Sequence, residues 1–298
     1  MKSNSCPICN NQDLIHELKV VVSPWIRRLG IHKKTSKYFY CQNCSFGFFN
    51  YRYSPKEMSL IYNLYRGENY LKNRNKWEPW YTKDFNAAYD RQSYINSKKK
   101  YLETFLLANL KSNVQTLVDY GGDKGQYIPN LGQKRSYLLD VSNNNILPGI
   151  KRISNLNEVI TPDLVILSHV LEHVSNPLAI LKNLLEQSKV VYVEVPFGCP
   201  QPDKQKGSIM KFLITLLTSF NPRLWSGKTQ ANAGRESLNR TLVQAEHLNF
   251  FTNETFYAIA QYLSASIVCV ESSVLAPDGM EAKVIQCLIS RKQSQFSS

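Results

Sequence analysis

The sequence lacks the long apolar runs that would place it in or across a membrane. Residues 1–7 hold no apolar segment of the kind that a secretion signal needs. The apolar stretch at residues 212–217 is interrupted by a threonine and is far too short to span a bilayer. We therefore expect a cytoplasmic protein with no transmembrane segment.

Cysteines are few, and most of them are paired in the sequence. Four of the seven form the motifs Cys6-Pro-Ile-Cys9 and Cys41-Gln-Asn-Cys44, which are 31 residues apart. Disulfides are not expected in a protein without a secretion signal, and neither pair opens a helix after a strand, as a redox motif would. Two Cys-x2-Cys turns complete a tetrahedral zinc site with no open position. The spacing predicts a structural zinc ribbon.

Acidic residues are scarce in the first third of the chain. The net charge is +13, and residues 1–101 carry 18 Lys and Arg against 7 Asp and Glu, which is +11 of that excess. Such a segment attracts phosphates in nucleic acid, nucleotide sugars or lipid headgroups, or it only keeps the protein soluble. Nine of the 17 tyrosines lie at residues 51–101. They are expected to pack between helices, and some of them to line a binding site.

From residue 114 onward, short apolar runs alternate with helical patterns. An amphipathic helix with proline in its first turn is expected from Pro177. Strands that alternate with helices indicate a parallel sheet covered on both faces, which is an α/β fold. Seven strands are predicted, at residues 116–120, 136–141, 150–153, 163–168, 189–195, 266–270 and 283–289.

Such sheets bind ligands at the carboxyl ends of their strands. The first strand is followed by Asp119-Tyr-Gly-Gly-Asp-Lys-Gly125, a turn that passes close to a ligand, and Asp140 ends the second strand. An acid at that position is suited to bind ribose hydroxyls. Ile128 stands where a dinucleotide motif has its third glycine, which favours a nucleoside without a pyrophosphate over NAD.

These residues resemble the class I S-adenosylmethionine-dependent methyltransferases over roughly residues 98–290. The matching segments are Val118-Asp-Tyr-Gly-Gly-Asp-Lys-Gly125, Leu138-Leu-Asp140 and the run from Asp163 to Pro177, which contains Ser168-His-Val-Leu-Glu-His-Val. The resemblance implies a Rossmann-like sheet of seven strands whose last strand is antiparallel.

The N-terminal cysteine pairs, Pro55-Lys-Glu and Glu246-His-Leu-Asn-Phe-Phe-Thr252 are similar to a bacterial subgroup of these enzymes. Members of that subgroup often serve sugar or surface-polysaccharide biosynthesis. The resemblance therefore implies a small glycosyl substrate, linked to a nucleotide or to a lipid.

The resemblance also implies roles for individual residues. The glycines of the loop would approach the methionine part of the cofactor, Asp140 would contact its ribose, and two residues at the fourth strand end would flank the transferred methyl group. The cofactor residues implied by the turn and by the resemblance are Asp119, Gly121, Gly122, Gly125, Asp140, Ser168 and His169.

The sequence departs from the usual Gly-x-Gly-x-Gly loop at Asp123. Its carboxylate would repel the carboxylate of the cofactor, unless Asp123 turns outward or pairs with the amino group of the cofactor. The positive charge of Lys124 would also offset this repulsion.

Methyl transfer is an in-line displacement, so the enzyme mainly aligns the acceptor and excludes water. A sugar hydroxyl also benefits from a general base, and histidine suits that role near neutral pH. The candidates are His169, His173 and His247, with structural roles at helix starts as the alternative for the last two. The Asn-Pro-Pro-Tyr motif of exocyclic amine methylation is absent after the fourth strand, so hydroxyl or carbon methylation is favoured.

Three segments are expected. They are a zinc-ribbon module at residues 1–50, a helical, aromatic-rich segment at residues 51–112 that caps the substrate, and the methyltransferase domain at residues 113–298. The domain carries an insert at residues 197–245 that is long for a compact fold. The insert contains an apolar helix at residues 208–220, and we expect it to form a lid over the substrate or, as an alternative, a contact with a membrane surface.

The main prediction is thus a methyltransferase that modifies a sugar. Two alternatives stay open: an RNA methyltransferase that uses the basic zinc module, and a non-catalytic binding protein on the same scaffold, which Asp123 would suit.

Overall fold

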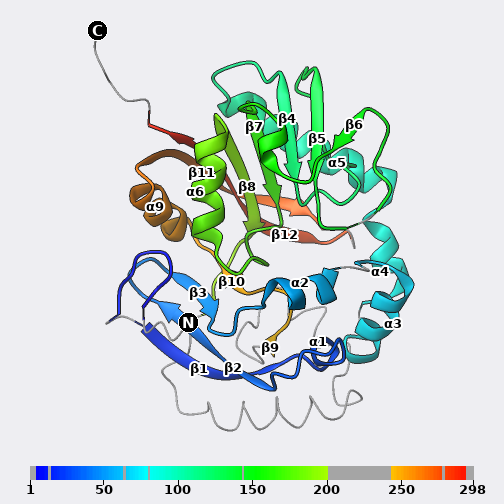
Figure 1. Ribbon diagram of the computed structural model, residues 1–298, viewed down its shortest axis with the longest axis vertical. Helices are drawn as coiled ribbons and strands as arrows, with labels where there is room; N and C mark the ends of the chain where they lie inside the picture. The colour runs from blue at the N-terminus through cyan, green and yellow to red at the C-terminus, as the bar shows by residue number, and fades with distance from the viewer. Residues whose placement is uncertain are drawn as a thin grey trace.

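The structure is a computed structural model that describes residues 5–12, 15–62, 65–79, 81–142, 144–200, 243–276 and 279–292. These residues form a seven-stranded sheet in the upper half of Figure 1 and a five-stranded sheet in the lower half, with helices around both. The predicted helix at residues 208–220 and most of the insert lie outside the described residues.

The larger sheet has the strand order β11-β12-β8-β7-β4-β5-β6. Strands β6, β5, β4, β7 and β8 are parallel, and β12 is antiparallel to both of its neighbours. The predicted α/β fold with a seven-stranded sheet and an antiparallel last strand is therefore confirmed. The strands are β4 (Thr116–Tyr120), β5 (Arg135–Leu139), β6 (Ile150–Arg152), β7 (Leu164–Ser168), β8 (Val190–Pro196), β11 (Ala265–Leu275) and β12 (Glu281–Arg291).

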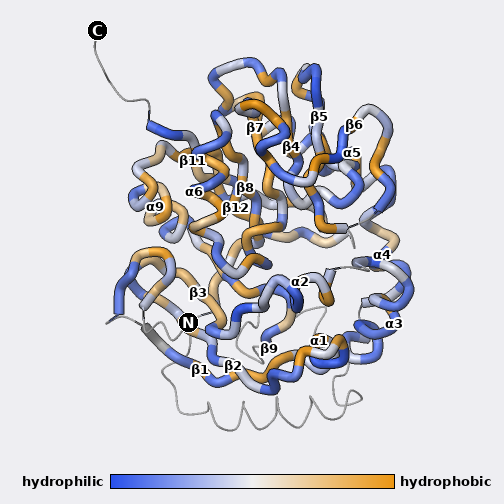
Figure 2. Tube along the Cα trace, in the orientation of Figure 1, coloured by the Kyte–Doolittle hydropathy of each residue, from blue (hydrophilic) through white to orange (hydrophobic). Residues whose placement is uncertain are grey.

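The central strands are apolar along most of their length because both faces of the sheet are covered (Figure 2). Val118 and Val165 pack on one face, in the same cluster as Leu181 of α6 (Pro177–Gln187) and Ile259 of α9 (Asn253–Tyr262). Their sequence neighbours face the opposite cluster, which includes Leu102 of α5 (Gln92–Asn109). Helix α6 begins where predicted: the Asn176 side chain accepts a hydrogen bond from the Ala179 backbone N–H, and proline occupies the first turn.

Helices occur within residues 51–112, where the sequence predicts a helical segment. They are α2 (Pro55–Tyr62), α3 (Glu68–Trp77), α4 (Lys83–Ala88) and α5. Farther along the chain, η1 (Leu156–Glu158) is a short 3-10 helix after β6. Trp25, from the short helix α1 (Pro24–Arg27), packs edge-on against Tyr70 of α3. Of the described tyrosines of residues 51–112, Tyr53, Tyr70 and Tyr81 are buried.

The smaller sheet combines strands from distant parts of the chain. Its order is β10-β3-β2-β1-β9, with β1 (Ile15–Val22), β2 (Thr35–Cys41) and β3 (Phe46–Phe49) in the middle. The two edges are β9 (Val243–Gln244), parallel to β1, and β10 (Asn249–Phe250), antiparallel to β3. The two edge strands lie at and just after the end of the insert, so the complete five-stranded sheet joins residues 243–250 to the N-terminal strands.

Aromatic rings join the two sheets. Phe46 of β3 lies 5.3 Å, centre to centre, from Phe251, which stacks in turn on Phe256 of α9 at 5.2 Å. The Thr255 hydroxyl donates a hydrogen bond to the Cys44 carbonyl at 2.9 Å. The cysteine loops therefore belong to the same hydrophobic core as the large sheet. The division at residues 50 and 112 stays a prediction.

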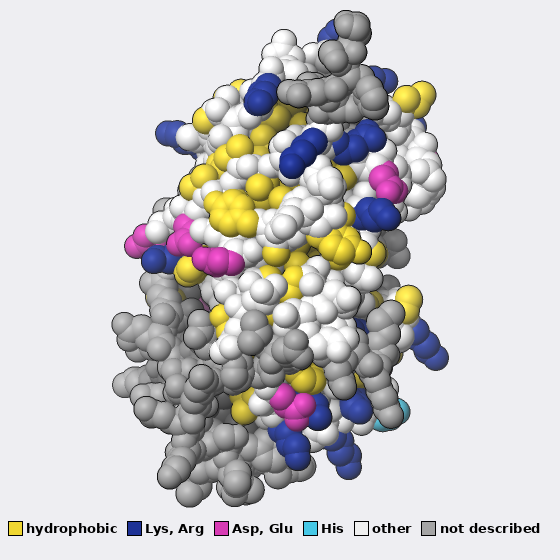
Figure 3. Space-filling model, turned by 90° about the vertical axis from the view of Figure 1, so that its left-hand side faces the viewer, with side chains coloured by type: hydrophobic (Ala, Val, Ile, Leu, Met, Phe, Trp, Pro, Cys, Tyr) yellow, Lys and Arg dark blue, Asp and Glu magenta, His cyan; other side chains and the backbone are white. Residues whose placement is uncertain are grey.

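Within the part of the chain described above, no helix has the length and apolarity needed to cross a membrane. Figure 3 shows apolar side chains gathered in the upper half of the face on which α9 and β11 lie. The exposed large side chains of these two elements are Tyr257, Tyr262, Val268 and Val270.

Candidate active site

The loop after β4 turns tightly at the carboxyl edge of the large sheet. Gly121 and Gly125 have φ angles of +78° and +76°, which glycine adopts at little cost. A Cβ atom on Gly122 would lie 1.9 Å from an oxygen of the Asp119 side chain, so the backbone passes that carboxyl group at a distance that only glycine allows. The loop is therefore packed tightly against Asp119, and its contact with a ligand stays a prediction.

Asp119 lies beneath this loop and is almost fully buried. Burial, together with the charges of Asp140 and Asp123, raises the pKa of its carboxyl group to about 7. A buried carboxyl with a raised pKa at a strand end is a frequent feature of functional sites.

Asp140 follows β5 and fixes two backbone segments at the same edge. One of its oxygens accepts a hydrogen bond from the Asp123 N–H at 2.8 Å, and the other accepts one from the Ser142 N–H at 2.6 Å. The acid predicted to contact ribose therefore lies directly beside the glycine loop.

The Asp123 side chain, which departs from the usual loop pattern, is held by three donors. Its Oδ1 accepts a hydrogen bond from Asn144 at 2.6 Å, and its Oδ2 accepts bonds from Arg66 and Gln126, both at 3.2 Å. The Arg66 side chain is only 10% exposed and also pairs with Asp90. The charge of Asp123 is therefore matched within the protein. Lys124, the compensating residue expected from the sequence, pairs with Asp90 instead, at 3.1 Å.

Ser168 and His169 stand at the end of β7, where the sequence places them. His169 has a φ of +57°, and its backbone N–H donates to the Glu194 carbonyl at 2.8 Å. Its Nδ1 lies 3.1 Å from the Glu172 carboxylate, and its Nε2 lies 2.9 Å from that of Glu194. Burial of the His169 ring by itself would lower its pKa. The hydrogen bonds to the carboxylates of Glu172 and Glu194 have the larger effect and raise that pKa to about 9. Both nitrogens are then protonated at neutral pH, although 43% of the side chain is exposed.

Glu194 is the centre of a buried polar network that sequence reasoning missed. It lies in β8, is fully buried, and pairs with the Lys98 ammonium of α5. The Ser168 and Tyr192 hydroxyls each donate to it at 3.1 Å. Burial alone would raise its pKa, but the charge of Lys98 and the bond from His169 hold that pKa well below its usual range. The signal in the sequence was a glutamate inside an otherwise apolar strand, which requires a buried partner.

His173 and His247 lie together, 74 residues apart in the sequence. Their rings are 4.7 Å apart, centre to centre, in an edge-to-face arrangement. The Glu172 backbone carbonyl accepts hydrogen bonds from the N–H groups of Leu248 and Asn249, at 2.6 and 3.0 Å, and this fixes the two segments to each other. Burial and the charge of His173 lower the pKa of His247 to about 4. The candidate histidines therefore form one group at the edge of the sheet, linked through Glu172.

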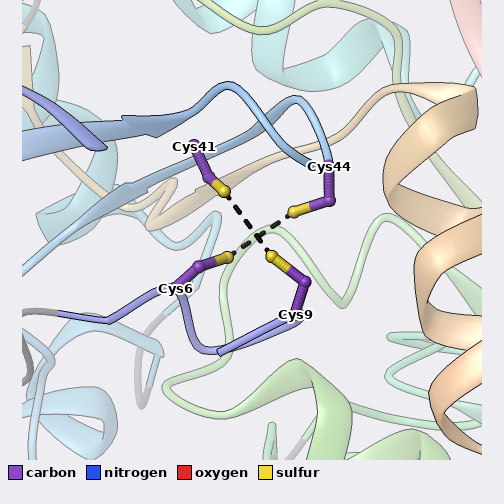
Figure 4. A group of neighbouring side chains, drawn as sticks. All are labelled: Cys6, Cys9, Cys41 and Cys44. Carbon is purple, nitrogen blue, oxygen red and sulfur yellow. Dashed lines mark hydrogen bonds between the residues drawn. The ribbon is translucent and has the colours of Figure 1, made fainter. Parts of the chain in front are cut away.

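The four cysteines of the two motifs converge at one end of the small sheet (Figure 4). Their sulfur atoms all lie within 4.8 Å of one another, with Cys6 and Cys44 3.5 Å apart and Cys9 and Cys41 3.6 Å apart. Cys41 ends β2, and Cys44 lies in the turn before β3. Four sulfurs in a compact group with no fifth donor suit a tetrahedral thiolate site.

The large sheet and the loop after its first strand define the class of protein, that of the class I methyltransferases. Residues 88–266, more than half of the chain, match the family model described as "Methyltransferase domain", so the chain belongs to that family. It is an S-adenosylmethionine-dependent methyltransferase. No curated protein matches the sequence.

Similar solved structures differ widely in what their names say they act on. Magnesium protoporphyrin IX methyltransferase from Synechocystis PCC 6803 is 14% identical, with a TM-score of 0.38, and the match covers 74% of this chain and 95% of that one. The plantazolicin methyltransferase BamL is 14% identical, with a TM-score of 0.43 and the same coverage. The 1,6-didemethyltoxoflavin-N1-methyltransferase from Burkholderia thailandensis is 10% identical, with a TM-score of 0.44, over 86% of this chain and 96% of that one. Similarities this distant carry no information about the acceptor.

Proposed function

We propose that this enzyme transfers a methyl group to a hydroxyl or a carbon of a glycosyl substrate. The observation that carries the proposal is the placement of the glycine loop after β4 and of the histidine group after β7 on the same edge of the large sheet. The glycine loop suits the binding of a cofactor, and the histidine group suits an acceptor from which a proton must be removed. The resemblance of the N-terminal cysteine pairs and of residues 246–252 to polysaccharide-biosynthesis enzymes supports a sugar as the acceptor.

The residues at the strand ends fit S-adenosylmethionine. Gly122 has no side chain, which lets the loop turn directly against the Asp119 carboxyl group at the end of β4. Because Asp123 is already paired with Arg66, it adds little repulsion toward the carboxylate of the cofactor. When bound, the cofactor supplies an electrophilic methyl group on a sulfonium. The residues proposed to hold it remain Asp119, Gly121, Gly122, Gly125, Asp140, Ser168 and His169.

The three histidines are not equivalent as candidate bases. Both ring nitrogens of His169 face carboxylates, so this residue suits the positioning of charge better than the removal of a proton. The side chain of His247 makes no hydrogen bond to any described residue, and the Nε2 atom of His173 faces Glu172 at 3.9 Å. We therefore assign the acceptor side of the reaction to His173 and His247.

The cysteine group is proposed to hold structural zinc. Cys6, Cys41 and Cys44 are buried and Cys9 is half-buried, so thiolates there need a cation. Zinc would join the loop before β1 to the turn between β2 and β3, and thus stabilise the small sheet that carries β10. Its role would be to fix the fold next to His247, with no part in the chemistry.

Methylation of RNA is less well supported than the net charge of residues 1–101 suggests. Arg66, Arg74 and Lys98 are at most 10% exposed and pair with acidic residues inside the protein. On the face that Figure 3 shows, the visible Lys and Arg side chains are scattered. Part of the basic excess therefore balances internal carboxylates instead of forming a surface for phosphates.

The test uses methyl-labelled S-adenosylmethionine with two acceptor pools: nucleotide sugars with polysaccharide extract, and total RNA. We expect label in the carbohydrate pool alone. Label in RNA alone would overturn the assignment and support the RNA alternative. Label in neither pool, together with no measurable cofactor binding, would support the non-catalytic alternative.

One pair of variants tests whether Arg66 neutralises the charge of Asp123 beside the cofactor. Arg66→Gln leaves Asp123 charged beside the loop, and we expect cofactor affinity to fall about tenfold, which is about 1.4 kcal/mol. Arg66→Gln combined with Asp123→Asn is expected to recover most of that loss. If the double variant binds as weakly as the single one, the pairing does not protect the cofactor site.

A further inference from the structure

The group formed by Glu172, His173 and His247 has the composition of a metal site. One ligand atom from each residue lies within 4.8 Å of the others. Two imidazoles and one carboxylate are a donor set that first-row divalent cations bind, and three protein ligands leave positions open for a substrate oxygen. The cysteine group, by contrast, offers four sulfurs.

The hydrogen bonds around His173 fix its tautomer. Its Nδ1 lies 3.2 Å from the Glu246 backbone carbonyl and 2.9 Å from the Tyr62 hydroxyl. A carbonyl oxygen only accepts hydrogen bonds, so Nδ1 carries the proton, and the Tyr62 oxygen then accepts as well. The Nε2 atom is left with its lone pair, and it is the atom that faces Glu172 at 3.9 Å. Metal-binding histidines are commonly oriented by such a bond from the other ring nitrogen to a backbone carbonyl.

Glu172 has one oxygen without a partner. Its Oε1 lies 3.1 Å from His169 Nδ1, whereas its Oε2 is buried and has no hydrogen-bond partner among the described residues. The side chain is only 2% exposed. An unpaired carboxylate oxygen in such a place is costly, and a cation would satisfy it. The other oxygen, Oε1, faces both His169 Nδ1 and, at 3.9 Å, His173 Nε2, so His169 fixes the position of the carboxylate, as partners of metal ligands do.

The backbone holds the three residues in place before any ligand binds. Asn249 donates its side-chain amide to the carbonyls of Leu171 and Val174, at 2.7 and 2.8 Å. Its own amide oxygen accepts a bond from Arg52 at 2.6 Å. The segment that carries His247 is thus fixed to the turn that carries Glu172 and His173. The His173 side chain is 18% exposed, which leaves a side open to the solvent.

We propose that Glu172, His173 and His247 bind a divalent first-row cation, and that this cation holds the acceptor oxygen of the substrate. The binding of the metal is independent of the acceptor, and its role in the reaction rests on the proposed function. For a hydroxyl acceptor, the oxygen binds the cation and releases its proton to water. A C–O bond then forms as the C–S bond breaks, and the sulfur keeps the electron pair, which leaves a neutral thioether.

The test is a titration with Mn²⁺, followed by electron paramagnetic resonance of the free ion. Mn²⁺ prefers nitrogen and oxygen ligands to thiolates, so it reports on this site and not on the cysteines. We expect one Mn²⁺ per chain in the wild type, and an affinity at least tenfold lower in Glu172→Gln and in His247→Gln. His32→Ala is the matched control, because His32 is exposed and distant in the sequence from the site, and it should bind like the wild type.

Total metal content, measured by mass spectrometry on the purified proteins, covers a cation too tightly bound to exchange. Wild type and His32→Ala should then hold one equivalent more than the two site variants. Equal metal content and equal Mn²⁺ binding in all four proteins would overturn the proposal. Circular dichroism establishes that the variants are folded, and Glu172→Gln keeps a polar group of the same shape.

The two proposals fail in different ways. If Mn²⁺ binds as expected but no label enters carbohydrate, the metal site stands and the proposed acceptor is wrong. If carbohydrate is labelled equally fast with and without the cation, the acceptor assignment stands and the role of the metal is wrong.

Discussion

The two sheets are stabilised in different ways. In the large sheet, β4, β7 and β8 are buried along nearly their whole length and form a continuous apolar core with the helices on both sides. The small sheet has edge strands of two residues each, and four cysteines gather at one of its ends. The large sheet therefore relies on hydrophobic burial. The small sheet, whose strands β2 and β3 are also mostly buried, depends in addition on a segment from far along the chain and, as we propose, on a zinc cross-link.

The two sheets contribute different parts of the proposed active site. The large sheet holds the glycine loop after β4, which we propose to bind the cofactor. The small sheet supplies, through β10, the segment that places His247 beside His173. With the proposed zinc in place, the cysteines would affect the reaction only through position, because they would stabilise the sheet to which β10 is attached.

The largest effect is expected from breaking the cross-link of the small sheet. Cys9→Ser removes one of four zinc ligands, and structural zinc contributes on the order of 10 kcal/mol to the folding of small modules. We expect zinc content to fall by about one equivalent and the thermal midpoint to fall by more than about 10 °C. Cys269→Ser, a half-buried thiol in β11, is the control and should keep its zinc. Equal zinc content in both variants would contradict the assignment.

A large effect is also expected inside the large sheet. Lys98→Met leaves the buried Glu194 with His169 as its remaining ionic partner, and breaking one half of a buried ion pair costs about 3–5 kcal/mol. The double variant Lys98→Met with Glu194→Gln should recover at least half of that loss, because no unpaired charge remains. Urea denaturation measures both values. A double variant as unstable as the single one would show that the charge pair is not what stabilises this region.

A smaller effect concerns pH. The folded-state pKa of Asp119 is about 7, whereas an unfolded chain has about 3.9. Between these two pKa values the folded form therefore binds more protons than the unfolded chain. The stability that Asp119 contributes is complete below about pH 4 and is lost as the pH rises through 7. The free energy of unfolding falls by no more than about 1.4 kcal/mol per pH unit from this group. Asp119→Asn should lack this slope. The test is to measure the free energy of unfolding of both proteins from pH 4.5 to 7.5. An identical dependence on pH in both proteins would contradict the raised pKa of Asp119.

The smallest effect separates loop geometry from general backbone strain. Gly125 and Gly132 have the same φ of +76°, but an added Cβ meets Ile150 at 2.5 Å in the first case and nothing within 4 Å in the second. Both alanine variants should lose about 1 kcal/mol of stability. Gly125→Ala should also bind S-adenosylmethionine about tenfold more weakly, as calorimetry would show, and Gly132→Ala should not. Unchanged affinity in both variants would remove Gly125 from the cofactor site.

Much of the large sheet could be predicted because its signals are local. Apolar runs of five to seven residues, separated by turns and one clear helix start at Pro177, indicate buried parallel strands. The cysteine spacing likewise predicts a compact group of four sulfurs. In both cases neighbouring residues in the sequence carry the whole pattern.

The remaining features depend on contacts between distant residues. The pairing of β9 and β10 with the N-terminal strands joins segments about 200 residues apart, and two-residue strands have no pattern of their own. The match of Arg66 to Asp123 and of Lys98 to Glu194 depends on where helices meet the sheet. The sequence therefore indicates which charges need partners, but the fold decides which partners they receive.

The left-handed backbone at His169 limits how this position can change during evolution. With a φ of +57°, most side chains would be strained there, and glycine, asparagine, aspartate and histidine are the residues best tolerated. A saturation library should therefore recover a short list of folded variants, with valine and isoleucine absent. Of that list, only histidine carries two ring nitrogens able to link Glu172 with Glu194. The backbone and the two carboxylates thus both favour histidine at this position.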